Sequence, residues 1–144
     1  MKMLRIALFL FAAVAAGQAV AQSCSGGTQV KNTGQANALG TLLAGKTVCA
    51  SLGSEQWHEY HGAGAGGGAL IDYKQGPNSK SDPSTQVGTW AVSGTGAGTQ
   101  VTYNYGGGGT FSYTVHEVGG KYNFCGPRVI ANARLVNGNS GCGQ

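Results

Sequence analysis

Hydrophobic and polar residues alternate most clearly in the middle of the chain. Residues 101–105 read Val-Thr-Tyr-Asn-Tyr, and residues 111–115 read Phe-Ser-Tyr-Thr-Val. Successive side chains of a β-strand point to opposite faces of its sheet, so each segment has one apolar face and one polar face. This alternation predicts half-buried strands whose apolar faces turn toward a core.

Glycine clusters divide the chain into short segments that are rich in β-forming residues. Glycine adopts the positive φ of tight turns, and the pair at 119–120 separates two alternating segments as a hairpin turn does. The glycine-rich chain is therefore expected to form consecutive short strands. Eight segments fit this description: 47–50, 56–61, 69–74, 87–93, 100–105, 110–118, 121–125 and 129–136.

A short helix is expected before the first of these strands. Leu39, Leu42 and Leu43 have the spacing of one helical face, and Gly45 follows as a helix-ending residue. Residues 22–45 would form an N-terminal arm with this helix, and residues 46–144 a single barrel domain. A meander of about eight short strands removes its exposed edges by closing on itself. The predicted fold is all-β, a small antiparallel up-and-down β-barrel, with a two-sheet sandwich as the alternative.

The first 21 residues have the three parts of a secretory signal peptide. Lys2 and Arg5 precede an apolar run at 6–16, and Ala-Val-Ala at 19–21 fits a cleavage site. The apolar run is too short to span a bilayer. We therefore expect a mature chain that begins at Gln22, in the periplasm or outside the cell.

The four cysteines are expected to form two disulfides in such an oxidising compartment. In a closed meander the first and last strands are neighbours, so Cys49 would lie near the corner that holds Cys125. Cys24 and Cys142 would then lie on the two terminal arms. We favour Cys49–Cys125 with Cys24–Cys142 over the sequential pairing of Cys24 with Cys49 and Cys125 with Cys142. Lipidation of Cys24 is an open alternative, which the poor fit of Gln22 disfavours.

Charge and hydropathy exclude some classes of partner. The chain has 9 Lys and Arg against 5 Asp and Glu, and without the two basic residues of the signal peptide the balance is 7 against 5, or +2. These basic residues are scattered singly, whereas nucleic-acid binding requires a basic patch. No second apolar stretch reaches membrane-spanning length. We expect a monomer with no nucleic-acid partner, no membrane span and no cofactor.

Residues 57–61, Trp-His-Glu-Tyr-His, form the densest cluster of polar and aromatic side chains. They resemble the H-E-x-x-H zinc motif but are one residue short, and that motif requires a helix. On a strand, Glu59 and His61 share one face. Together with His116 they form the candidate centre of an alternative function, a small metal-dependent enzyme or metal-binding protein.

Two resemblances to known proteins add to this picture. Gly88-Thr89-Trp90, with Arg134 on the last expected strand, resembles the G-x-W element of lipocalins and the arginine that packs over its tryptophan. That resemblance covers these residues alone, and in lipocalins the motif opens the first strand. A longer pattern resembles a group of small secreted bacterial proteins of uncharacterised function and implies a shared secreted β-fold. It comprises DYK at 72–74, Asp-Pro at 82–83, VGTW at 87–90 and YNFC at 122–125.

These observations predict a non-enzymatic secreted or periplasmic binding or interaction protein. Barrels of about eight strands hold one small ligand, so the expected partner is a small apolar ligand. A structural or inhibitor-like protein that acts on another envelope protein is a further alternative. The same aromatic residues would equally fill a solid core, so the interior volume decides between these readings. The candidate lining is Tyr60, Tyr73, Trp90, Tyr103, Tyr105, Phe111 and Tyr113.

Overall fold

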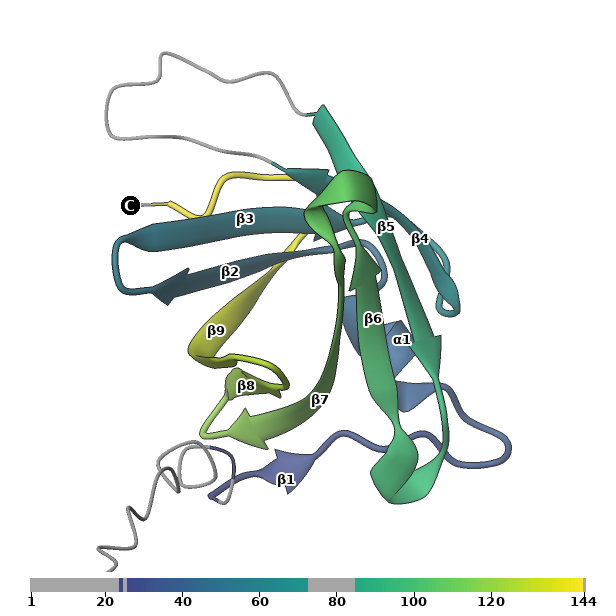
Figure 1. Cartoon of the computed structure of the whole chain (residues 1–144). Coiled ribbons are helices and arrows are strands. Elements are labelled where there is room, and N and C mark those ends of the chain that lie inside the picture. Colours follow the sequence, from purple (N-terminus) through teal and green to yellow (C-terminus); the bar gives the residue numbers. More distant parts are fainter. Residues whose placement is uncertain (1–23, 25, 73–84, 144) are drawn as a thin grey trace, which may run out of the picture.

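Nine antiparallel strands and one short α-helix make up the described part of the chain, which comprises residues 24, 26–72 and 85–143 of a computed structural model (Figure 1). Two short 3₁₀ turns, η1 (Gly96–Gly98) and η2 (Gly106–Gly108), connect strands. The helix is α1 (Ala38–Leu43). The strands are β1 (Thr28–Gln29), β2 (Lys46–Leu52), β3 (Glu55–His61), β4 (Gly67–Asp72), β5 (Thr85–Ser93), β6 (Gln100–Asn104), β7 (Thr110–Val118), β8 (Lys121–Cys125) and β9 (Val129–Asn137).

Eight of these strands close into an up-and-down barrel, which confirms the predicted fold class. Each strand from β2 to β8 pairs antiparallel with the next, and β9 closes the barrel by pairing with β2, where Val48 lies opposite Leu135. The short strand β1 extends the sheet beside β7, with Thr28 opposite Glu117. The barrel therefore has a single layer of strands around one interior, as Figure 1 shows.

Helix α1 lies at one end of this interior. The Asn37 side chain accepts a hydrogen bond from the amide of Gly40 and so caps the helix, and Gly45, with φ of +71°, turns the chain into β2. Leu39 and Leu43 are fully buried, and the helix packs against β2, β5 and β6. None of the described helices has the length and apolar character that crossing a membrane requires.

The barrel interior beside α1 is filled by side chains from four adjacent strands of the wall. Leu70, Trp90, Val101 and Val115 are at most 2% exposed. They come from β4, β5, β6 and β7, so inward-facing residues of alternate positions meet here as the sequence pattern predicts. This end of the barrel is a packed core.

Two disulfides fasten the terminal arms to the outer wall of the barrel, but the predicted pairing is wrong. The bonds join Cys24 to Cys125 and Cys49 to Cys142, which is neither the favoured pairing nor the sequential one. Strand β9 lies between β2 and β8, so Cys49 and Cys125 stand two strand spacings, roughly 10 Å, apart. A disulfide requires Cα atoms within about 7 Å. Each strand cysteine is bonded instead to the cysteine of one terminal arm.

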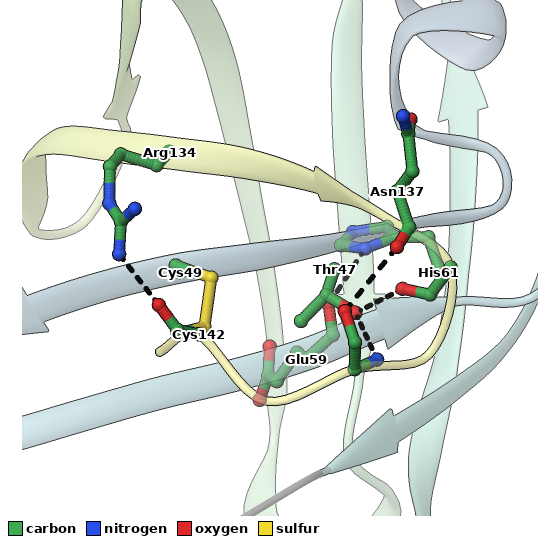
Figure 2. Close-up of a disulfide and its surroundings, with 9 residues drawn as sticks. Thr47, Cys49, Glu59, His61, Arg134, Asn137 and Cys142 are labelled. Carbon is green, nitrogen blue, oxygen red and sulfur yellow. Dashed lines mark hydrogen bonds between the residues drawn. A yellow bond between two sulfur atoms is a disulfide. The ribbon is translucent and has the colours of Figure 1, made fainter. Parts of the chain in front are cut away.

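The C-terminal arm crosses the outer face of β2 (Figure 2). Thr47 donates its hydroxyl to the carbonyl of Gly138 at 2.6 Å and accepts a hydrogen bond from the amide of Ser140 at 3.3 Å. Arg134 Nη2 donates to the carbonyl of Cys142 at 2.8 Å. With the Cys49–Cys142 bond, these contacts hold the arm against the barrel near the end that α1 occupies.

Candidate ligand-binding cavity

The end of the barrel opposite α1 contains an open cavity of about 590 Å³. Pockets for small ligands range from about 300 to 1,000 Å³, so this volume suits one small molecule. Six aromatic residues dominate the lining: Trp57, Tyr103, Tyr105, Phe111, Tyr113 and Phe124. The remaining lining residues are Val48, Ala50, Val87 and Ile130, which are apolar, and Glu55, Gln56, Glu59, Asp72 and Arg128, which are polar.

The seven residues predicted to line a binding site fall into different places. Four of them line this cavity, namely Tyr103, Tyr105, Phe111 and Tyr113. Trp90 lies deeper, in the packed end, and is 2% exposed. Tyr60 lies between Glu59, which lines the cavity, and His61, which is buried in the interior, so the alternation of β3 turns its side chain to the outer face. Tyr73 lies outside the described residues.

Trp57, Glu59 and Phe124 are lining residues that the sequence reading did not assign to the ligand site. A signal for two of them was present, because Trp57 and Glu59 share a strand face. Glu59 and His61 on that face suggested a metal centre instead of a ligand-binding wall.

Glu59 brings a carboxylate into this aromatic surrounding. The side chain lies on β3, is 9% exposed, and accepts hydrogen bonds from the Tyr105 hydroxyl at 3.0 Å to Oε1 and 2.9 Å to Oε2. Burial, together with the negative charge of Glu59, raises the pKa of Tyr105 far above its ordinary value of 10.0. The phenol therefore stays protonated and acts as the donor.

His61 and Tyr103 form a buried, hydrogen-bonded pair next to the cavity. His61 is fully buried, with Nδ1 at 3.2 Å from the carbonyl of Glu59 and Nε2 at 2.9 Å from the Tyr103 hydroxyl. Burial lowers the pKa of His61 to about 4, so the ring is neutral at pH 7. Because a carbonyl only accepts, Nδ1 carries the proton and Nε2 accepts from Tyr103. The Trp90 ring packs edge-on against the His61 ring, with the two ring centroids 5.1 Å apart.

The predicted metal centre of Glu59, His61 and His116 is contradicted by the barrel geometry. Glu59 and His61 face the interior, whereas His116 follows the inward-facing Val115 on β7 and therefore turns outward, where Nε2 lies 3.1 Å from the Thr114 hydroxyl. Across the described parts of the chain, no group of three or more His, Cys, Asp or Glu residues is arranged to hold a metal ion.

The tryptophan and the arginine of the lipocalin-like pattern lie on different sides of the barrel wall. Trp90 is inside, while Arg134 extends over the outer face of β9 to the Cys142 carbonyl (Figure 2). No protein-family model matches this chain, and no curated protein or solved structure matches it. Both resemblances stay predictions, and the cavity itself is the feature that carries functional information.

Proposed function

We propose that this protein is an exported, non-enzymatic binding protein that holds one small, largely apolar molecule in the open mouth of its barrel. The observation that carries the proposal is the cavity of about 590 Å³ with six aromatic side chains in its lining. Binding sites for small molecules combine such a mostly apolar surface with a few fixed polar groups. Here Glu59 and the Tyr105 hydroxyl are fixed by their hydrogen bonds to each other.

The polar groups near the cavity support binding rather than catalysis. Both ring nitrogens of His61 are engaged, one with the Glu59 carbonyl and one with Tyr103. A general base acts best with a pKa near the working pH, and the pKa of His61 lies at about 4. The histidine therefore serves as a support for Tyr103, which is part of the cavity wall.

Export is supported by the covalent structure. The two disulfides are consistent with an extracellular or periplasmic protein, because cytosolic conditions keep thiols reduced. The signal-peptide pattern at residues 1–21, which lie outside the described residues, points to the same compartment. A ligand that meets the protein there must pass through water, so the barrel interior would shelter its apolar surface.

The proposal is tested with N-phenyl-1-naphthylamine, an uncharged dye that fluoresces in apolar surroundings. We expect the disulfide-bonded protein to bind one dye molecule, and Ala50→Trp, which places an indole in the cavity, to weaken binding by about tenfold or more. Ala97→Trp is the matched control, because Ala97 is exposed on η1 at the other end of the barrel. Absence of binding, or equal binding by the Ala50 variant, would overturn the proposal.

A further inference from the structure

The three tyrosines of the cavity wall differ in what their hydroxyls contact. The Tyr103 hydroxyl donates to His61 Nε2 at 2.9 Å, and the Tyr105 hydroxyl donates to the two carboxylate oxygens of Glu59 at 3.0 Å and 2.9 Å. Both phenols are therefore committed to acceptors inside the protein. The Tyr113 hydroxyl, in contrast, has no hydrogen-bond partner in the described part of the chain.

This unpaired hydroxyl is accessible from the cavity. Tyr113 lines the cavity, and although the residue as a whole is only 7% exposed, its hydroxyl oxygen is not one of the fully enclosed polar atoms. The hydroxyl is therefore left to bond with water or with a ligand. A ligand group that displaces this water keeps the hydrogen bond only if it matches the phenol.

Packing holds the Tyr113 ring in one position. Its centroid lies 6.0 Å from that of Tyr103 and 6.3 Å from that of Phe124, which meets it in T-shaped geometry. The turn between β8 and β9 also approaches the ring closely, because a Cβ atom on Gly126 would lie 2.7 Å from Tyr113 Cδ1. Only glycine permits this approach. Since the ring is fixed before a ligand arrives, little conformational entropy is lost when its hydroxyl binds.

The charges near the Tyr113 hydroxyl favour a ligand atom that accepts a hydrogen bond. Burial raises the pKa of Tyr113, so the phenol is protonated at neutral pH and can donate. The guanidinium of Arg128 opposes this rise in pKa, and the carboxylate of Glu59 adds to it by a smaller amount. The stronger influence is thus a positive charge, which attracts the partly negative oxygen of a carbonyl and repels a ligand N–H group.

We propose that the ligand is an apolar ketone or ester, whose carbonyl oxygen accepts a hydrogen bond from the Tyr113 hydroxyl while its apolar body contacts the aromatic wall. This inference rests on the proposed function and names the ligand class of the same cavity. A carbonyl carries no net charge, so its binding does not depend on how the carboxylates of the lining are paired. A pure hydrocarbon displaces water from the phenol without replacing the hydrogen bond, and this loss weakens its binding.

The first test compares two probes of nearly the same shape. They are 2-acetylnaphthalene and 2-isopropenylnaphthalene, in which a CH₂ group replaces the carbonyl oxygen. Titrations followed by the chemical shift of the Trp57 indole N–H give the ratio of the two dissociation constants in each protein. Tyr113→Phe keeps the ring and removes only the hydroxyl, so we expect it to shift this ratio about fivefold against the ketone. The hydrocarbon should bind both proteins equally, within about twofold.

Tyr60→Phe is the matched control for this test. It loses the same hydroxyl on the outer face of β3 and should keep the wild-type ratio. An unchanged ratio in Tyr113→Phe would overturn the inference but leave the binding function intact. Failure of both probes to bind the wild-type protein would also overturn the inference, and failure of the naphthylamine dye in addition would overturn the proposed function.

The second test reports the hydrogen bond directly and needs only the wild-type protein. The carbonyl stretching frequency of 2-acetylnaphthalene falls when its oxygen accepts a hydrogen bond, and a ¹³C label separates this band from those of the protein. We expect the frequency of the bound ketone to lie below its value in hexane and to rise in Tyr113→Phe. A bound ketone that absorbs at the hexane frequency in the wild-type protein would refute the inference, whether or not the variant folds.

Discussion

The two ends of the barrel are built from the same strands but differ in what fills them. Val101 on β6 and Tyr105, which directly follows β6, both face inward, yet Val101 is fully buried and Tyr105 is only partly so. At the Val101 end, α1 inserts Leu39 and Leu43 into the interior. At the Tyr105 end, no such element from the described residues enters, and a cavity of about 590 Å³ remains.

This difference shows that inward orientation and burial are separate properties in a small barrel. The strand period decides which side chains face the interior, whereas the helix decides which of them become core. The end closed by α1 should therefore govern stability, and the open mouth should govern binding. Substitutions and pH changes at each end separate these two roles.

The largest effect is expected from opening the packed end. Leu43→Ala removes a fully buried side chain of α1 and should lower the free energy of unfolding by about 3 to 4 kcal/mol. Urea denaturation of the disulfide-bonded protein measures this loss. Leu52→Ala, at the mouth end of β2 where Leu52 is 38% exposed, should cost less than about 1 kcal/mol. Equal losses at both positions would contradict the division of roles.

Acidification should lower the free energy of unfolding by nearly as much as Leu43→Ala does, because His61 is buried in its neutral form. The pKa of His61 is about 4 in the folded protein and has an ordinary value of 6.5, so between these values the unfolded chain binds the proton more strongly. The contribution of neutral His61 is fully present above pH 6.5 and is lost as the pH falls toward 4, by up to about 3 kcal/mol.

Unfolding curves measured between pH 7 and pH 4 test this prediction. The variant His61→Gln keeps an acceptor for Tyr103 but does not titrate, so its stability should fall less steeply across the same interval. The difference between the two proteins isolates the histidine from the carboxylates, which titrate in both. Parallel pH profiles would rule out His61 as the source of the dependence.

A smaller loss is expected where the C-terminal arm is held near the packed end. Thr47→Val removes the hydroxyl that donates to Gly138 and accepts from Ser140, and should cost about 1 to 2 kcal/mol in unfolding free energy. Thr110→Val is the control, because Thr110 is exposed at the mouth end of β7 and the change there should stay within about 0.5 kcal/mol. Similar losses in both variants would argue against a stabilising role of the arm contacts.

The smallest effect on stability is expected at the rim of the mouth. Arg128→Gln breaks an exposed ion pair with Glu55 and should change the unfolding free energy by less than about 0.5 kcal/mol. Lys121→Gln, exposed at the start of β8, loses the same charge and should also change the unfolding free energy by less than about 0.5 kcal/mol. A loss of more than about 1 kcal/mol in the Arg128 variant alone would contradict a minor role of the ion pair.

Local sequence pattern determined the strands, the helix and the closed meander. The bounds of β7 and β8 agree with the predicted 110–118 and 121–125, since alternation and the glycine pair at 119–120 act over a few residues. The short strand β1 escaped prediction because two residues are too few to show a period. Alternation also placed Glu59 and His61 on one face, and Tyr103, Tyr105, Phe111 and Tyr113 among the candidate lining residues.

What those faces meet depends on how the strands and arms are placed in the folded barrel. The cysteine pairing depends on where each terminal arm meets the barrel, and β9 between β2 and β8 separates Cys49 from Cys125. Likewise, the opposition of Glu59 and Asp72 depends on the register between β3 and β4. Among the described residues, α1 fills one end of the interior and the cavity lies at the other. Each of these features joins residues that are far apart in the chain, so the local alternation of hydrophobic and polar residues does not specify it. The strands, in contrast, follow from this alternation over a few neighbouring residues.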